Sequence, residues 1–157
     1  MIQCPSPNFR RMKTPRIVTC IVIHATATSG IDSPKEWLCN PESGVSAHYL
    51  IGLDGQTFQL VDENNVAWHA GKSEWGGKKG VNAFSIGIEL VNSNDGVCEY
   101  PCEQIASCSE LVVGICKERG IRPENVVGHA DISPGRKTDP AAFPWDDFRI
   151  NLKEKLP

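Results

Sequence analysis

Apolar residues recur along the chain with two spacings, one typical of strands and one typical of helices. Residues 17–23 (IVTCIVI) are β-branched and apolar on both faces, which predicts a strand buried on both sides that ends at His24. Over residues 84–91 apolar and polar positions alternate, so Glu89 falls mid-strand, on the face opposite the isoleucines and near the core. Residues 126–127 (VV) predict a further short strand.

A hairpin and an irregular segment are predicted between these strands. Residues 48–53 and 56–61 are two strand-like runs separated by Asp54-Gly55, a pair that suits a tight two-residue turn because both residues tolerate positive φ. Residues 62–82 are rich in glycine, asparagine, lysine and tryptophan without sustained periodicity, so we expect an irregular surface loop. Long loops in compact domains are often functional.

Three segments have the features of helices. Residues 33–36 (SPKE) form a capping box with proline at the first helical position, which predicts a short helix that the Asn-Pro pair at 40–41 ends. Residues 103–119 carry apolar side chains at i, i+3, i+4 and i+7 and are followed by Gly120, and residues 145–156 again place apolar side chains on one helical face. Strands that alternate with helices, together with a hairpin, predict an α/β fold with a single mixed β-sheet flanked by helices.

Size and charge bound the possible partners. A chain of 157 residues has the size of one domain, so we expect a single domain over residues 1–157 with residues 1–16 as an N-terminal extension packed on it. The net charge of -3 provides no global positive field for nucleic acid or an anionic membrane. The longest apolar run is far shorter than the ~20 residues that span a bilayer, and residues 1–16 lack the apolar region of a signal peptide. We therefore expect no nucleic-acid partner, no membrane association and a monomer.

The cysteines do not suggest a disulfide framework. Seven is an odd number, and without a secretory signal the default is reduced thiols in a cytosol. Cys98 and Cys102 allow an alternative interpretation as two metal ligands, but no second ligand pair lies at a zinc-finger distance from them. Buried apolar thiols are the favoured interpretation.

Three potential metal ligands lie at or beyond the ends of predicted strands. His24 ends the first strand, His129 follows the strand at 126–128, and Asp139 comes ten residues later. Two imidazoles and one carboxylate leave the fourth position of a zinc ion open for water, which then loses a proton near neutral pH. Taken singly, a histidine at a strand end is more often structural, and Asp139 before Pro140 is able to open a turn. The combination predicts a hydrolytic zinc site.

Several motifs along the chain resemble one known family. They are HAT at 24–26, SAHYLI at 46–51, WHAG at 68–71, NAFSIGIEL at 82–90, GHADI at 128–132 and GRKTDP at 135–140. In this order they resemble the type 2 N-acetylmuramoyl-L-alanine amidases, which share their fold with phage amidase lysozymes and peptidoglycan recognition proteins. The resemblance runs from about residue 17 to the C-terminus and is specific, because separate motifs occur in the family's order and the ligand spacings agree.

The resemblance implies a reaction and a role for five residues. The reaction is hydrolysis of the lactyl amide bond between muramic acid and L-alanine in peptidoglycan or muropeptides. His24, His129 and Asp139 are implied to bind zinc, Glu89 to act as general base, and Lys137 to stabilise the transition state.

Physical reasoning about Glu89 and Lys137 agrees with these roles and leaves alternatives. Desolvation of Glu89 on a largely apolar strand is expected to raise its pKa toward the range useful for proton transfer; the alternative is a solvated or salt-bridged glutamate. Lys137 precedes Asp139 by two residues, close enough to offset negative charge on a carbonyl oxygen. Its alternative is an ordinary surface lysine.

The chain departs from some relatives at one position. Phage lysozymes and recognition proteins often have a tyrosine before the histidine of the SxHY-like segment, whereas this chain has Ala47. Glu89 is then expected to carry the proton chemistry. The third ligand, Asp139 rather than a cysteine, places the chain nearer the bacterial enzymes than the animal recognition proteins.

Four further residues are expected around the substrate: His48, His69, Asn82 and Arg136. His48 is either a donor that orients a metal ligand or a core histidine with satisfied hydrogen bonds. His69 is expected to line the substrate groove together with Trp75 and the loop around Asn82. Arg136 suits a carboxylate of the stem peptide, with plain surface exposure as its alternative.

Two other functions compete with the amidase. One is a non-catalytic peptidoglycan-binding module, although such modules typically lack one metal ligand and this chain keeps all three candidates. The other is a different zinc hydrolase, such as a peptidase cutting within the stem, although no H-E-x-x-H pair is present. Lack of a signal peptide fits a cytoplasmic enzyme that recycles wall fragments, and equally a phage-type lysin released by another protein.

Overall fold

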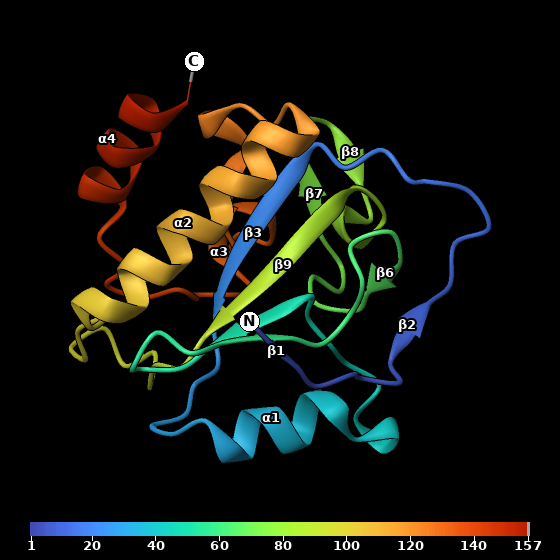
Figure 1. Cartoon of the computed structure of the whole chain (residues 1–157), viewed down its shortest axis with the longest axis horizontal. Helices are drawn as coiled ribbons and strands as arrows, with labels where there is room; N and C mark the ends of the chain where they lie inside the picture. Colours follow the sequence, from blue (N-terminus) through green and yellow to red (C-terminus); the bar gives the residue numbers. More distant parts are fainter. Residues whose placement is uncertain (157) are drawn as a thin grey trace.

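The computed structural model describes residues 1–156 and is built on a six-stranded mixed sheet (Figure 1). In spatial order the strands are β1 (Ile2–Gln3), β5 (Thr57–Gln59), β4 (Tyr49–Ile51), β9 (Ser85–Leu90), β3 (Cys20–Ala25) and β10 (Val126–Gly128). Only β4 and β5 run antiparallel, and the other four neighbouring pairs are parallel. The predicted α/β fold with a single mixed sheet flanked by helices is confirmed.

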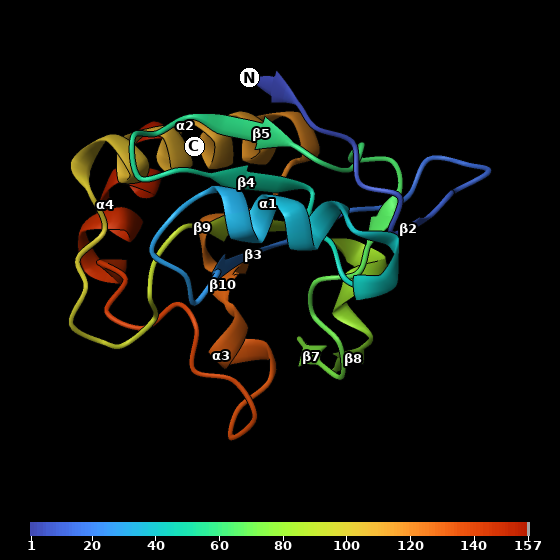
Figure 2. The same ribbon diagram turned by 90° about the horizontal axis from the view of Figure 1, so that it is seen from below.

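Helices cover both faces of this sheet. The helices α2 (Cys102–Arg119) and α4 (Trp145–Lys155) lie on one face, and α1 (Asp32–Cys39) lies on the other (Figure 2). The larger core cluster joins α2 and α4 to Ile21, Ile23 and the isoleucines of β9. A second cluster packs Leu38 of α1 against the opposite face of the hairpin strands. The two clusters follow from the period-2 alternation of side chains along each strand.

Strands β3 and β9 form the centre of the sheet and carry the predicted alternation. Ile86, Ile88 and Leu90 are fully buried beneath α2, so Glu89 points to the other face, as expected. The first strand begins later than predicted, because Cys20 pairs with Ser85, the first residue of β9. Residues 17–19 precede this pairing, and Ile17 is 81% exposed. The strand also extends to Ala25, so His24 lies inside β3 rather than beyond its end.

The predicted hairpin is confirmed, but its turn is longer than two residues. The Gly52 amide donates to the Gln56 carbonyl, which leaves three residues in the loop, and Gly55 adopts a φ of 78°. A left-handed glycine at the third loop position is the usual solution for a three-residue hairpin loop. A Cβ at Gly55 would also meet the Glu103 backbone of α2 at 2.7 Å, so this position requires glycine for two reasons.

Helix α1 forms where expected, but without the predicted capping box. Its N-cap is Ile31, whose carbonyl accepts from the Lys35 amide, and no side chain caps it. Proline is tolerated at any position of the first turn, because the N–H group that it lacks would have no intrahelical partner there. Pro34 is the third residue of α1, so its presence did not identify the residue at which the helix begins. Asn40 ends the helix as predicted, and the 3-10 turn η1 (Pro41–Ser43) follows.

The segment 62–82 is less irregular than predicted, because it contains three short strands. They are β6 (Val66–Ala67), β7 (Glu74–Trp75) and β8 (Lys78–Lys79), followed by the 3-10 turn η2 (Val81–Phe84). β7 and β8 pair with each other, and β6 pairs with β2 (Phe9–Arg10) of the N-terminal segment. Residues 1–16 thus contribute one strand to the main sheet and one to this small second sheet.

The helices α2 and α4 agree closely with the sequence. α2 ends at Gly120, which has a φ of 67°, and α4 buries Phe148 and Leu152. The short elements η3 (Pro123–Asn125) and α3 (His129–Ile132) flank β10. Pro157, the last residue of the expected domain, lies outside the described residues.

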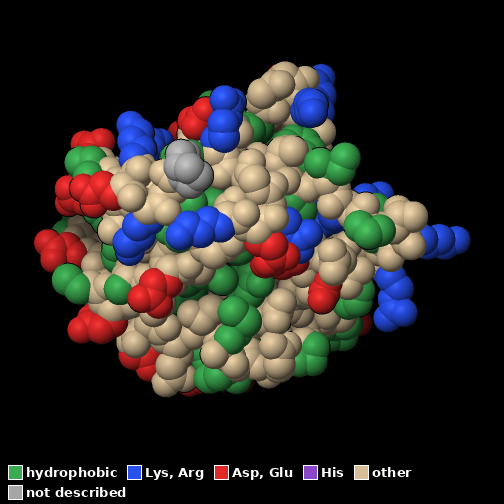
Figure 3. Space-filling model, turned by 45° about the horizontal axis from the view of Figure 1, so that its top comes forward, with side chains coloured by type: hydrophobic (Ala, Val, Ile, Leu, Met, Phe, Trp, Pro, Cys, Tyr) green, Lys and Arg blue, Asp and Glu red, His purple; other side chains and the backbone are tan. Residues whose placement is uncertain are grey.

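Side chains of both charges lie on the surface. None of the helices within residues 1–156 has the length and apolar character needed to span a bilayer. Basic and acidic side chains intermingle on the face drawn in Figure 3, in keeping with the small net charge. No histidine is visible there, and all four histidines are buried.

Candidate active site

Three parallel strands bring the candidate ligands to one edge of the sheet. β10, β3 and β9 are neighbours that run in the same direction, so their carboxyl ends lie side by side. His24 is near the end of β3, and His129 directly follows β10 as the first residue of α3. The chain then returns through the loop that carries Asp139, whose carbonyl accepts from the Ala130 amide. This edge of an open parallel sheet is where α/β proteins usually bind ligands.

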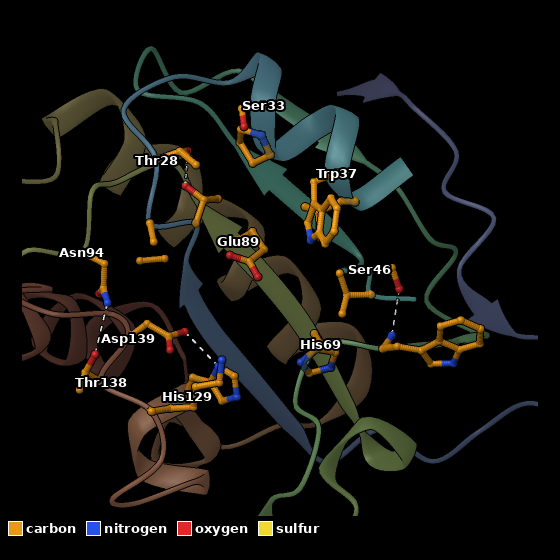
Figure 4. A pocket seen from close by; sticks show the side chains of 18 of the residues that line it. Thr28, Ser33, Trp37, Ser46, His69, Glu89, Asn94, His129, Thr138 and Asp139 are labelled. Carbon is orange, nitrogen blue, oxygen red and sulfur yellow. Dashed lines mark hydrogen bonds and ion pairs between the residues drawn. The ribbon is translucent and has the colours of Figure 1, made fainter. Parts of the chain in front are cut away.

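His24, His129 and Asp139 form a compact buried group (Figure 4). The two histidine Nδ1 atoms are 2.9 Å apart, and Asp139 Oδ2 lies 3.0 Å from Nδ1 of His129 and 3.4 Å from Nδ1 of His24. Two atoms that each lie about 2.0–2.1 Å from a tetrahedral zinc ion are about 3.3–3.4 Å apart. The Asp139–His24 separation equals this edge and the other two separations are shorter than it, so the three donor atoms are clustered closely enough for one ion, and two imidazoles with one carboxylate are a donor set that fits zinc.

Hydrogen bonds to the Nε2 atoms of His129 and His24 determine which ring nitrogen of each residue keeps a lone pair. His129 Nε2 is 3.2 Å from the Ala70 carbonyl, which accepts only, so Nε2 carries the proton and Nδ1 is left as a lone-pair donor. His24 Nε2 is 2.9 Å from Nδ1 of His69. A second partner that holds the outer ring nitrogen is the usual arrangement for a metal-binding histidine.

His69 connects His24 to a buried chain of hydrogen bonds. Its Nε2 lies 3.1 Å from the hydroxyl of Ser85, and that hydroxyl donates to the Val81 carbonyl at 2.7 Å. Because the hydroxyl proton of Ser85 is used in the bond to Val81, the Ser85 oxygen accepts from Nε2–H of His69. Nδ1 of His69 is then unprotonated and acts as an acceptor. Nδ1 of His69 then accepts from Nε2–H of His24, which leaves Nδ1 of His24 free for a metal.

Gly87 makes room for His69. A Cβ built at Gly87 would overlap the imidazole ring of His69, so this close approach requires glycine at the middle of β9. Burial lowers the pKa of His69 well below its ordinary value, and the charges of His24 and His48 lower it further. His69 therefore stays neutral, and its Nδ1 atom keeps the lone pair with which it accepts the hydrogen bond from His24.

Burial and neighbouring charges set the protonation of His24 and Asp139. Desolvation lowers the pKa of His24 to about 4, so its imidazole is neutral at pH 7. Burial alone would raise the pKa of Asp139, but the adjoining imidazoles of His129 and His24 lower it, and the net effect holds that pKa well below its ordinary value. A neutral imidazole and an ionised carboxylate are the protonation states that metal binding needs.

Glu89 lies beside this group in an unusual electrostatic setting. Burial, with a smaller contribution from Asp139, raises its pKa to about 8, while the charge of Lys137 acts in the opposite direction. Its Oε2 atom is buried without a hydrogen-bond partner, and the side chain borders the cleft. A carboxyl group with a pKa near neutrality is able both to accept and to release a proton.

A cleft of about 490 Å³ opens over these residues. Glu89, His129 and Asp139 line it together with the predicted residues His69, Arg136 and Lys137. Figure 4 shows Glu89 between His129 and the α1 wall, where Trp37 stands. The structure therefore brings seven of the nine predicted site residues to one place: six line the cleft, and His24 is in contact with two of these six, His129 and Asp139.

His48 and Asn82 are not among the residues that line this cleft. His48 is fully buried, accepts a hydrogen bond from the Gly87 amide at 3.0 Å, and lies 2.8 Å from the Arg16 guanidinium. Asn82 accepts from the amides of His69 and Ala70 with its side-chain oxygen. Both residues shape the backbone that carries the site. Ala47, where some relatives have tyrosine, is also fully buried.

The sequence did not reveal several cleft residues. Trp37 on α1 is 56% exposed and Trp68 is 37% exposed, and both line the cleft. Asn94 lines it from a backbone with a φ of 56°, where its side-chain oxygen accepts from the Ala141 amide at 2.7 Å. The sequence signal for this wall was the segment 33–36, which predicted a helix and gave no indication that the helix borders a site.

Comparisons with known proteins agree on one family. Residues 13–142 match the family model described as N-acetylmuramoyl-L-alanine amidase. The 1,6-anhydro-N-acetylmuramyl-L-alanine amidase AmpD of Haemophilus influenzae is 34% identical over 96% of this chain and 91% of its own length. The N-acetylmuramoyl-L-alanine amidase AmiD of Escherichia coli is 42% identical over 85% of this chain, which covers only 52% of that longer protein.

Solved structures show the same fold. A selenomethionine derivative of AmpD superposes with a TM-score of 0.85 at 28% identity, covering 96% of this chain and 93% of that chain. The E. coli AmiD complex with the substrate anhydro-N-acetylmuramic acid-L-Ala-D-gamma-Glu-L-Lys superposes with a TM-score of 0.78 at 36% identity, covering 90% and 60%. By motif, sequence identity and fold, the chain belongs to the N-acetylmuramoyl-L-alanine amidase family.

Proposed function

We propose that this chain is a zinc-dependent amidase that hydrolyses the lactyl amide bond between muramic acid and L-alanine. The observation that carries the proposal is Glu89, whose pKa is raised to about 8 and whose Oε2 atom is buried without a hydrogen-bond partner, beside a compact His-His-Asp group. A buried carboxyl without a partner costs stability, so its place at a cleft argues for a function. Membership of the N-acetylmuramoyl-L-alanine amidase family indicates which bond is hydrolysed.

His24, His129 and Asp139 would hold the zinc ion through the Nδ1, Nδ1 and Oδ2 atoms that face one another. When bound, zinc polarises a carbonyl group and lowers the pKa of a water molecule. We assign His69 to orient His24 rather than to bind substrate, because its Nδ1 is occupied by His24 Nε2. Loss of such an outer partner typically weakens metal binding 10–100-fold.

Glu89 moves the proton in this mechanism. Its carboxylate takes a proton from the attacking water, holds it at the buried carboxyl, and passes it to the L-alanine nitrogen as that nitrogen leaves. The raised pKa matches both halves of this transfer. The exposed ammonium of Lys137 borders the same cleft and offsets the negative charge that grows on the carbonyl oxygen.

Arg136 and the aromatic walls would recognise the substrate. One nitrogen of the Arg136 guanidinium donates to the carbonyls of Ala70 and Lys72, which fixes the group at the cleft. We assign its remaining donors to a carboxylate of the stem peptide. The exposed rings of Trp37 and Trp68 would pack against the sugar or peptide.

The natural substrate is proposed to be a soluble muropeptide. AmpD, which matches over nearly its whole length, is named for 1,6-anhydro-N-acetylmuramyl-L-alanine, and AmiD has been solved with an anhydromuropeptide. We accordingly propose that residues 1–157 act as one domain, as a monomer and in the cytoplasm. Residues 1–16 would serve as an extension that braces the site.

The test combines metal analysis with product analysis. The purified protein is expected to contain one zinc per chain, to release a peptide with a free N-terminal alanine from an anhydromuropeptide, and to lose this activity to a chelator and regain it with zinc. A peptide cut within the stem would identify a different zinc hydrolase. Stoichiometric muropeptide binding without a new N-terminal alanine would instead identify a non-catalytic binding module.

A further inference from the structure

Two cysteines far apart in the sequence lie in contact on the side of the molecule that carries α1. Cys4 follows β1, and Cys39 is the last residue of α1. Their Sγ atoms are 3.6 Å apart, although the residues are 35 positions apart. Cys39 also places its thiol 3.5 Å from the Cys4 carbonyl, so the two side chains point toward each other.

The backbones on both sides of this contact are anchored. The Cys4 amide donates to the Gln59 carbonyl at 3.0 Å, which holds the N-terminal segment along β5. Further along, Ser6 donates to the Leu38 carbonyl, and the Asn8 amide group donates to the Asn40 carbonyl at 2.7 Å. These contacts fix the two chain segments side by side and hold the sulfurs 3.6 Å apart, compared with the ~2 Å of a disulfide bond.

Both thiols are only partly buried, so a small oxidant is able to reach them. The buried cysteines are different, because burial raises the pKa of both Cys20 and Cys108 to about 12 and leaves them unreactive. Burial, together with the hydrogen bond to Cys4, raises the pKa of Cys39 to about 11, which makes Cys39 the poorer attacking group. Because the Cys39 thiol donates to the Cys4 carbonyl, Cys4 is the thiol expected to react first.

We propose that Cys4 and Cys39 form an intramolecular disulfide when the protein meets a low-molecular-weight disulfide such as oxidised glutathione. The Cys4 thiolate attacks the small disulfide, forms a mixed disulfide and releases one thiol. Cys39 then loses its proton to solvent, attacks the Cys4 sulfur and releases the second thiol. Two protein thiols are oxidised, and one small disulfide is reduced to two thiols.

The cross-link would act on the wall of the cleft. Ser33, Pro34, Trp37 and Leu38 of α1 line the cleft, and Cys39 is the next residue along the chain. A bond to Cys4 would tie the end of α1 to the strand that pairs with β5. This proposal concerns the fold of the chain, and neither it nor its test depends on the proposed reaction.

The test compares the full chain after treatment with oxidised and with reduced glutathione. Alkylation, digestion and mass spectrometry are expected to give a linked Cys4–Cys39 peptide after oxidation, with Tm raised by roughly 5–15 °C for a loop of this length. Cys4→Ser and Cys39→Ser should lose the linked peptide and keep the glutathione adduct on the remaining cysteine. Cys98→Ser, which removes another partly buried thiol, should behave as the unmodified chain.

Two results would overturn the proposal. One is that the unmodified chain accumulates glutathione adducts on Cys4 or Cys39 without any linked peptide. The other is that the linked peptide joins different cysteines, or appears equally in Cys4→Ser. Because the linked peptide is identified by mass, neither result is confused with a variant that folds poorly.

Discussion

His24 and Glu89 are register partners on the neighbouring parallel strands β3 and β9, and both side chains point away from α2. His24 therefore presents a ring nitrogen and Glu89 presents a carboxyl group on the same face of the sheet, and the spacing of the two strands sets the separation between them. No loop has to order for these two groups to meet. A site built on paired strands is held in place by the backbone hydrogen bonds of the sheet.

Replacement of Glu89 by glutamine is expected to remove most turnover and to leave the metal in place. Glutamine keeps the shape of the side chain but cannot carry the proton, so kcat should fall by about 10²–10⁴-fold. Steady-state rates on a muropeptide and zinc content per chain are the measurements. Glu154→Gln, on the exposed side of α4, is the matched control and should keep its rate. A near-normal rate for Glu89→Gln would remove this residue from the mechanism.

Two substitutions of His69 should separate its contacts with His24 and Ser85. Asparagine keeps an acceptor near the position of Nδ1, which faces His24, whereas glutamine reaches only the position of Nε2, which faces Ser85. We expect His69→Gln to weaken zinc binding about 10–100-fold in a chelator competition and His69→Asn to weaken it much less. Equal losses in the two variants would mean that packing, not the contact with His24, is what His69 provides.

Gly87→Ala tests the close approach that His69 needs. The new methyl group would overlap the imidazole ring, so the free energy of unfolding should fall by about 1–3 kcal/mol and zinc binding should weaken as well. Gly114→Ala is a suitable control, because nothing lies within 4 Å of a Cβ at that helical position. It should raise the free energy of unfolding by about 0.5–1 kcal/mol. Urea unfolding of both variants measures the difference, and similar effects would contradict the steric explanation.

The sequence indicated that His24, His129 and Asp139 lie together, because its signals are local. Each ligand lies at the end of a strand or in the loop after it, and parallel strands bring such ends together without further information. The alternation around Glu89 likewise indicated which face it occupies. Hydrophobic patterning was enough for the central strands β3 and β9 and for the helices at 102–119 and 145–155, but not for the edge strand β1.

The roles of the two other histidines were not predictable in the same way. His48 was the candidate for orienting a metal ligand and His69 the candidate for the groove, but it is His69 that contacts His24. That contact depends on the path of residues 62–82, which Asn82 fixes through two backbone amides, and on the missing side chain at Gly87. Contacts of this kind arise from tertiary packing and leave no periodic pattern in the sequence.

His48 should make the stability of the metal-free protein depend on pH. Burial, followed by the charge of Arg16, lowers its pKa from 6.5 to about 3, so the unfolded chain binds a proton between these values and the folded chain does not. The contribution of His48 to the free energy of unfolding is complete above pH 6.5 and is lost as the pH falls. The loss amounts to about 2 kcal/mol between pH 7.5 and pH 5. His48→Asn keeps an acceptor for the Gly87 amide but does not titrate, so its free energy of unfolding should fall less over this interval. Because His24 and His69 titrate in both proteins, urea unfolding of the chelator-treated pair at the two pH values isolates His48. Equal losses of stability in the two proteins would show that His48 is protonated equally in the folded and unfolded states.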